Sequence, residues 1–222
     1  MNDTFNRQAI HIQEFFPKLS LIDPNDSIIS GEIDIVDSFG KYFDTYKIEI
    51  RSSSSFPSSF PYVYETGGMI PKNVDWHVYE TTGMCCLKVA VEEILECEKD
   101  LTLVGFIENQ VLPYLFNQTF RRIHGYFLNE RRHGIPGIID FYSDIFKTSD
   151  IDNLIYLFNF VIQAQEPNRV ATCFCGSHFK YRHCHKAAFR KLKSVETKQL
   201  VNDLYCIYLY QVRVNSLAQF IL

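Results

Sequence analysis

Four potential metal ligands fall within one short window near the end of the chain, and they constrain the local fold more than any other feature. The window reads CFCGSHFKYRHCH and contains Cys173, Cys175, Cys184 and His185. Zinc prefers four cysteine or histidine ligands arranged as a tetrahedron. Cys173 and Cys175 bracket one residue, and Gly176 follows, so the chain turns back and Cys184 with His185 completes the set. The sequence therefore predicts a bound Zn²⁺.

Other cysteines and histidines leave alternatives open. The alternative to a metal site in this window is a pair of unligated thiols on a turn. His178 and His183 are spare ligands if His185 does not bind. Cys97 and Cys206 lack partner spacing and are expected to be packed thiols. Seven cysteines, an odd number with metal-type spacing, fit a reducing compartment better than a disulfide framework. A cytoplasmic location is the expectation.

Length and net charge limit the classes of protein to which the chain could belong. The chain has 222 residues, of which 46% are hydrophobic, so one medium domain and a small appendage are expected and disorder is not. The formal net charge of −4 argues against bulk attraction to nucleic acid or to an anionic membrane. The sequence contains neither an apolar run of membrane-spanning length nor an N-terminal signal pattern.

Apolar periodicity predicts strands in the first half of the chain. Residues 3–21 are loosely helical, with Pro17 as a kink or an end. Residues 27–36 and 42–50 alternate as two antiparallel strands around the turn formers of residues 37–40. Residues 62–65 give a third strand, and residues 86–91 form a short fourth strand or an extended run.

The second half is predicted to be helical. Residues 101–125 have a helical pattern that Pro113 kinks or splits, and residues 133–137 form a loop. Further helices are expected at residues 138–146 and at 151–163, with Ser149 as N-cap of the latter. Residues 187–222 are expected to form one long amphipathic helix or two. Residues 164–172 form a polar linker. The layout is α+β: a helix, an antiparallel meander, a cysteine segment, then helices.

A second cysteine segment precedes the helical half. Cys86 lies in Gly-Met-Cys-Cys-Leu, nine residues after His77 and downstream of the steps Phe56-Pro57 and Phe60-Pro61. This order resembles the catalytic core of ubiquitin-conjugating enzymes, over roughly residues 1–150 and most strongly over residues 56–87. The window 173–185 is similar to the SEC-C zinc knuckle. The resemblance implies a ubiquitin-conjugating-enzyme-like (UBC) domain over residues 1–163, then a SEC-C-like knuckle with a terminal helix over 164–222.

The resemblance also implies roles for individual residues. Cys86 takes the place of the catalytic cysteine, and Cys85 takes the buried apolar place before it. His77 matches the first residue of the family's His-Pro-Asn turn, whereas Val78 and Tyr79 replace the proline and the asparagine. That departure puts the family's usual oxyanion arrangement in doubt. His77 either works directly in the chemistry or only holds the turn.

Each of these residues could instead have a purely structural role. Cys86 could be a buried core thiol, since free cysteine packs like a small hydrophobic residue. Asp75 either orients His77 or a substrate lysine, or is an ordinary loop carboxylate. His133 either closes on the cysteine from its glycine-flanked loop or is a surface histidine. A basic set in the zinc segment is either a solvated face or a docking surface; its members are Lys180, Arg182, Lys186, Arg190, Lys191 and Lys193.

The function implied by the resemblance is acyl transfer. A cysteine would carry a protein C-terminus as a thioester and pass it to an acceptor amine. Bacterial relatives of this kind occur in CBASS antiphage operons, where the substrate is a cGAS-like nucleotidyltransferase (CD-NTase) whose conjugation primes signalling. The chain lacks a nucleotide-binding loop, so an activating enzyme would be a separate partner. The alternatives are a catalytically inactive UBC-like binding module and a zinc adaptor.

Overall fold

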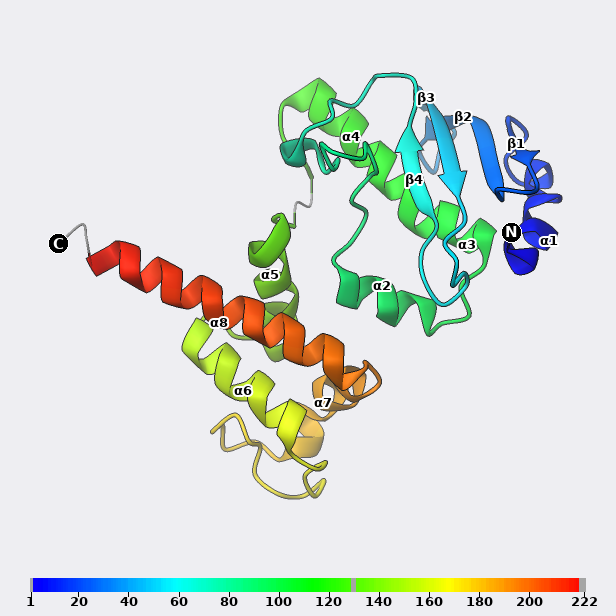
Figure 1. The fold of residues 1–222 in the computed structure, drawn as a ribbon. Coiled ribbons are helices and arrows are strands. Elements are labelled where there is room, and N and C mark those ends of the chain that lie inside the picture. The colour runs from blue at the N-terminus through cyan, green and yellow to red at the C-terminus, as the bar shows by residue number, and fades with distance from the viewer. Residues whose placement is uncertain (1, 129–130, 220–222) are drawn as a thin grey trace. The chain divides into compact units, whose positions relative to one another are not determined.

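The chain divides into two compact units. The structure, a computed structural model, describes residues 2–128 and 131–219. The units comprise residues 1–130 and 131–222, and Figure 1 shows their elements. Helices α5 (Gly134–Phe146) and α6 (Ile151–Gln163), which the sequence analysis placed in the first domain, therefore group with the cysteine–histidine window.

An antiparallel sheet forms the frame of the first unit. Within the described residues its four strands follow the order β1 (Leu19–Asp23), β2 (Ile28–Val36), β3 (Tyr42–Arg51) and β4 (Tyr62–Glu65). Their apolar side chains alternate with polar ones, and the buried set includes Ile33, Ile48 and Val63. The predicted α+β class, the two long strands and the third strand are confirmed.

The start of the chain differs from the prediction. The expected helix over residues 3–21 is only α1 (Asp3–Ala9) and a 3₁₀ turn (Ile12–Glu14), and β1 follows. Pro17 cannot continue a helix, and Leu19 then enters the sheet with its side chain fully buried. Gly31 of β2 faces this segment at a φ of 151°, and a Cβ there would lie 2.0 Å from the carbonyl oxygen of Lys18. A glycine is required at this position.

One long helical segment packs against the sheet. It runs through α3 (Leu103–Phe106), a π-helical turn (Ile107–Val111) and α4 (Leu112–His124), as predicted, with Pro113 tolerated in the first turn of α4. In Figure 1 this segment lies behind the strands, and α4 contacts β2 and β3. The core between them includes Phe5, Phe106 and Leu115.

A buried polar cluster links the sheet to α4. The Tyr46 hydroxyl lies 2.9 Å from Thr119 Oγ1, and Thr119 donates to Asp44 Oδ2 at 3.2 Å. Arg122 pairs with the same carboxylate at 2.8 Å. Because the Tyr46 side chain is fully buried, burial raises the pKa of its hydroxyl to about 12 and keeps it neutral. The cluster fixes the position of α4 along the two central strands.

Helices make up the second unit. Helix α8 (Thr197–Gln219) contacts α5 and α6, and α7 (Lys186–Lys193) contacts α6. The Tyr142 hydroxyl of α5 donates to Asp203 of α8 at 2.8 Å, between buried side chains. The amphipathic region predicted over residues 187–222, as one helix or two, forms two helices, and its residues 220–222 lie outside the described residues.

Three local predictions were wrong. The extended run over residues 86–91 ends early, because α2 (Ala90–Cys97) begins inside it. The loop predicted at residues 133–137 is the first turn of α5, which Gly134 opens. The N-cap of α6 is Asp150 rather than Ser149, since the Asp150 carboxylate accepts from the amide of Asn153 at 2.8 Å.

The cluster between sheet and helix makes a stability prediction. Thr119→Val should lower the free energy of unfolding by about 1–3 kcal/mol, because it leaves the buried Tyr46 hydroxyl without its partner. Fluorescence of Trp76, the single tryptophan, follows unfolding of the first unit in urea. The exposed Thr66→Val is the matched control and should shift stability by less than about 0.5 kcal/mol. Equal effects of the two changes would contradict this role of Thr119.

Candidate active site and metal centre

A tight backbone hairpin presents the cysteine pair. Val78 and Cys85 pair as an antiparallel bridge, the amide of Tyr79 donates to Met84 O at 2.9 Å, and the amide of Cys86 donates to His77 O at 2.7 Å. Gly83 closes the reversal with a φ of 73°. The hairpin joins the sheet through Cys85, whose amide donates to Val63 O at 2.8 Å. This pairing was not predicted from the sequence.

The pairing gives the two cysteines opposite environments. Side chains alternate along each arm, and directly opposed residues share a face. Val78 and Cys85 point into the core and are 4% exposed. Tyr79 and Cys86 are diagonal neighbours on the other face, where Tyr79 is 46% exposed and Cys86 is half-buried. Adjacent cysteines are thus separated into a sealed thiol and an accessible one.

One face of α4 holds the turn that leads into the hairpin. Tyr114 donates to His77 O at 3.1 Å, Gln118 donates to Trp76 O at 2.8 Å, and Arg121 donates to Asp75 O. Three consecutive carbonyl groups therefore accept from three side chains spaced along one helix face. Arg121 also lies over the Trp76 ring, 4.2 Å from its centroid.

His77 and Asp75 occupy this anchored turn. His77 has a left-handed backbone, with φ 53° and ψ 42°, which ends the 3₁₀ turn Val74–Trp76 and aims the chain into the hairpin. Its ring packs edge-on against Phe127 at a centroid distance of 5.1 Å. Asp75 is exposed, and its amide donates to the side chain of Asn73 at 2.7 Å. The chemical roles expected for His77 and Asp75 stay predictions.

Two neighbours of Cys86 were not predicted from the sequence to be functional residues. Tyr79 is close enough for its hydroxyl to lower the pKa of the Cys86 thiol. Glu93, in the first turn of α2, acts electrostatically on the same thiol. Burial raises the pKa of Glu93 to about 7, so this carboxyl group titrates near neutrality. The spacing from Cys86 to Glu93 carried no recognisable signal, because a helix starting at Ala90 was not expected.

Both cysteines have raised pKa values. Burial raises the pKa of Cys85 to about 11, and the Tyr114 hydrogen bond only partly offsets it. Burial also raises the pKa of Cys86, with a further contribution from the Glu93 charge, while the hydrogen bond from Tyr79 lowers it. Cys86 is the more exposed of the two and the one with a hydroxyl donor on the accessible face.

The four predicted metal ligands come together in the second unit. The ligand atoms of Cys173, Cys175, Cys184 and His185 all lie within 4.8 Å of one another. Cys175 Sγ and Cys184 Sγ are 3.6 Å apart, and His185 Nδ1 lies 3.3 Å from Cys173 Sγ and 3.2 Å from Cys184 Sγ. A tetrahedral zinc site with metal–sulfur bonds of about 2.3 Å separates its sulfur atoms by roughly 3.8 Å. The donor set and its spacing fit zinc.

A helix outside the window orients the histidine ligand. His185 Nε2 lies 2.9 Å from the carbonyl oxygen of Phe146, the last residue of α5. A carbonyl only accepts, so Nε2 carries the proton and the Nδ1 lone pair faces the cysteines. Phe174 stacks on Phe160 of α6 at 4.3 Å. The knuckle is therefore supported by both helices, which explains why they belong to its compact unit.

A metal ion bound by these four residues would be structural in character. All four positions of the tetrahedron are protein ligands, and zinc would cross-link the loop after α6 to the start of α7. His178 and His183, the spare candidates, are exposed and lie outside the cluster. Cys97 and Cys206 are also outside it, as free, partly buried thiols.

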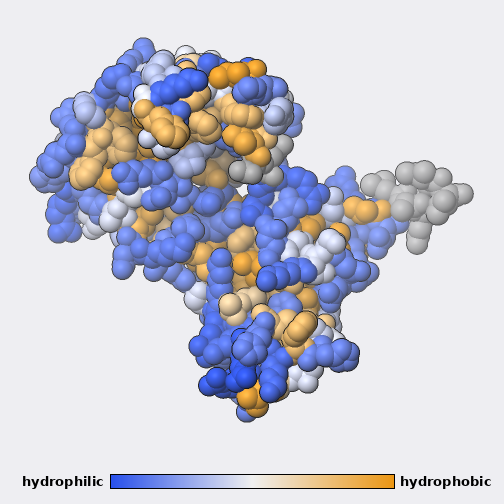
Figure 2. Space-filling view, turned by 180° about the vertical axis from the view of Figure 1, so that it is seen from behind, coloured by the Kyte–Doolittle hydropathy of each residue, from blue (hydrophilic) through white to orange (hydrophobic). Residues whose placement is uncertain are grey.

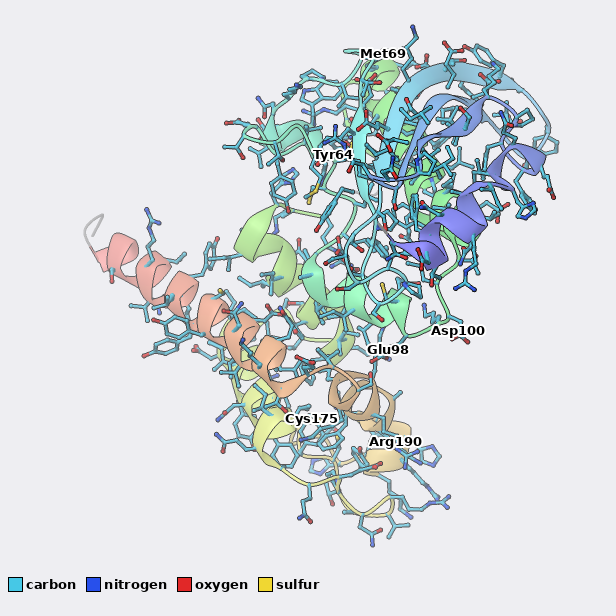
Figure 3. All side chains as sticks on the ribbon, turned by 45° about the vertical axis from the view of Figure 1, so that its right-hand side comes forward. Tyr64, Met69, Glu98, Asp100, Cys175 and Arg190 are labelled. Atoms are coloured by element: carbon cyan, nitrogen blue, oxygen red, sulfur yellow. The ribbon has the colours of Figure 1, made fainter. Side chains whose placement is uncertain are left out.

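The predicted basic set lies on and before α7. Lys180, Arg190, Lys191 and Lys193 are exposed, and Arg190 pairs with Glu166 at 2.7 Å. Figure 3 labels Cys175 in the loop and Arg190 on α7. Figure 2 shows mostly hydrophilic side chains over this end of the second unit. Among the described residues, none of the helices combines the length and apolar character of a membrane span.

Comparison with known proteins adds no assignment. Neither a protein-family model, nor a curated protein, nor a solved structure matches the chain. The functional reading therefore depends on the chemistry of the two sites.

The two cysteine environments predict different labelling rates. In the folded protein at pH 8, iodoacetamide should modify Cys86 before Cys85, because burial limits access to Cys85 and raises its pKa to about 11. Both rates should rise with pH, since only the thiolate reacts and both pKa values lie above that of a free thiol. Peptide mass mapping distinguishes the sites through Cys85→Ala and Cys86→Ala. Faster labelling of Cys85 would contradict the assignment of faces.

The metal centre predicts one zinc ion per chain. His185→Ala removes a ligand and should speed zinc release to a chelator by at least about 10-fold, as measured with a colorimetric zinc indicator. His178→Ala, an exposed histidine outside the cluster, is the matched control and should release zinc at the wild-type rate. Wild-type protein without zinc, or equal release by the two variants, would refute the site.

Proposed function

We propose that the protein is a cysteine-dependent acyl transferase resembling ubiquitin-conjugating enzymes, with Cys86 as the acyl carrier. The observation that supports this most is the separation of the cysteine pair: Cys85 is sealed in the core, and Cys86 lies on the accessible face of an anchored hairpin. A core thiol needs no such presentation. The family's α+β arrangement of helix, meander and cysteine segment is part of the same proposal.

The proposed reaction has two acyl-transfer steps. The Cys86 thiol loses its proton to solvent, and its sulfur attacks the carbonyl carbon of a donor thioester, whose own thiolate leaves. An acceptor amine then attacks the Cys86 thioester, the carbon–sulfur bond breaks, and the Cys86 thiolate is released. The amine nitrogen loses one proton as the amide forms, and Glu93, with a pKa of about 7, is the nearby carboxylate suited to accept it.

The raised pKa of Cys86 suits a carrier. A thiolate with a high pKa is more nucleophilic and a poorer leaving group than one with a low pKa. Acyl transfer from a more acidic donor thiol onto Cys86 is therefore favourable, and the resulting thioester resists displacement by water. Release then depends on a positioned amine, which is the behaviour a conjugating enzyme requires.

The substrate part of the proposal comes from the resemblance. The acyl group would be the C-terminus of a cGAS-like nucleotidyltransferase of a CBASS system, delivered by a separate activating enzyme. Zinc at Cys173, Cys175, Cys184 and His185 would hold the second unit together rather than enter the chemistry. Its exposed basic residues offer a surface for an acidic region of the partner.

A catalytically inactive binding module is the second candidate. Two observations favour it: burial keeps the Cys86 thiol protonated at neutral pH, and the His77 ring packs on Phe127. In that case the hairpin would serve only as a recognition surface.

Intact mass after co-expression with the neighbouring genes tests the proposal. Acid-quenched, non-reduced wild-type protein should carry a thiol-labile adduct, and Cys86→Ala should lack it while Cys85→Ala keeps it. The adduct mass identifies the donor. An adduct that survives Cys86→Ala, or no adduct on any variant while zinc stays bound, would refute the acyl-transfer function.

A further inference from the structure

We propose that the Tyr79 hydroxyl is a catalytic hydrogen-bond donor, which stabilises first the Cys86 thiolate and then the oxyanion formed on the acyl carbon. Its part in the oxyanion step rests on the proposed acyl transfer. Tyr79 stands where ubiquitin-conjugating enzymes carry asparagine, so the chain would perform that step with a phenol.

The hairpin register brings the two side chains together. Tyr79 is paired with Met84 through its amide, and Cys86 is paired with His77, so Tyr79 and Cys86 lie diagonally across one face. A diagonal neighbour is within reach of a long aromatic side chain. In agreement with this register, the Tyr79 hydroxyl lowers the pKa of the Cys86 thiol, as a donor to the thiolate does.

The backbone amides of Cys85 and Cys86 already donate hydrogen bonds within the protein. The amide of Cys86 donates to His77 O at 2.7 Å, and the amide of Cys85 donates to Val63 O at 2.8 Å. Neither group is available to an oxyanion without breaking the hairpin or its link to the sheet. The Tyr79 hydroxyl is a side-chain donor on the accessible face that needs no such rearrangement.

The same hydroxyl can serve both stages of the reaction. The oxyanion develops on the carbon bonded directly to Cys86 Sγ, so a donor that reaches the sulfur also reaches the neighbouring oxygen. Donors fixed before charge develops stabilise the transition state without reorganisation. Burial raises the pKa of Tyr79 to about 12, so the phenol keeps its proton and remains a donor at neutral pH.

Glu93 is the charged group that acts on this pair. Its carboxylate influences both the Cys86 thiol and the Tyr79 phenol. A negative charge there disfavours the thiolate, which the hydroxyl opposes by donating to it. The effect of removing the hydroxyl can thus be measured on the thiol alone, without any acyl donor.

Tyr79→Phe removes the hydroxyl and keeps the ring. Because the side chain is 46% exposed, the variant should fold, and the urea midpoint followed by Trp76 fluorescence checks this. Tyr62→Phe is the matched control, since Tyr62 is a 44% exposed tyrosine on strand β4 of the same unit. All proteins are full-length and zinc-loaded.

The first measurement is the pH profile of Cys86 alkylation by iodoacetamide, mapped by peptide mass. We expect Tyr79→Phe to raise the midpoint by about one pH unit, a tenfold lower thiolate fraction at neutral pH. Tyr62→Phe should match the wild type. A midpoint in Tyr79→Phe equal to that of the wild type would overturn the proposal, whether or not the protein transfers acyl groups.

The second measurement tests the oxyanion step with a short peptide thioester as acyl donor and lysine as acceptor. Once Cys86 is acylated, Tyr79→Phe should slow aminolysis on the order of 100-fold relative to wild type and Tyr62→Phe. An unchanged aminolysis rate would overturn the oxyanion role. If the wild type takes no acyl group onto Cys86, the oxyanion role is overturned together with the proposed function, and the alkylation profile still decides the thiolate contact.

Discussion

The contact between α4 and the turn at residues 75–77 is the constraint on which the first unit's candidate site depends. Gln118 and Tyr114 supply donors to two backbone carbonyl groups that would otherwise lie unpaired near the core. With the turn held, the left-handed backbone of His77 directs the chain into the hairpin, and the alternation along the hairpin decides which cysteine is sealed. Helix α4 itself is fixed by the polar cluster around Thr119. The accessibility of Cys86 thus depends on the contacts between the sheet and α4, which position the turn and, through it, the hairpin.

The second unit depends on a similar arrangement. The end of helix α5 at Phe146, outside the metal window, fixes the tautomer of His185, so a bound metal would stabilise the helical packing as well as the window. Zinc binding to such a site contributes directly to folding, because the unfolded chain lacks the preformed ligand set. In both units, a hydrogen bond from a side chain to a backbone carbonyl group orients the candidate site. The carbonyl groups of Trp76 and His77 position the cysteine hairpin, and that of Phe146 positions His185.

The features that could be predicted from the sequence are those set by residues close together in the chain. The metal ligands share one window, and the strands of residues 28–36 and 42–51 follow alternation, so both could be found from the sequence. Strand β1 was missed because its short pattern follows a helical one without a break other than Pro17. The anchor at Gln118 was missed because it joins segments about 40 residues apart, which periodicity does not encode. The hairpin at Tyr79 was missed because its two arms are too short to show an alternating pattern. Glu93 was missed because residues 86–91 were predicted as a strand or an extended run, whereas α2 begins at Ala90.

Comparing Cys85 and Cys86 labelling in Gln118→Leu with that in the wild type tests the central claim most directly. The substitution keeps the volume of the side chain but removes the donor to Trp76 O. If α4 holds the hairpin that separates the two thiols, the variant should loosen the hairpin and increase Cys85 alkylation relative to Cys86 by about 10-fold. A ratio unchanged from the wild type, in a variant that lacks this hydrogen bond, would contradict the account.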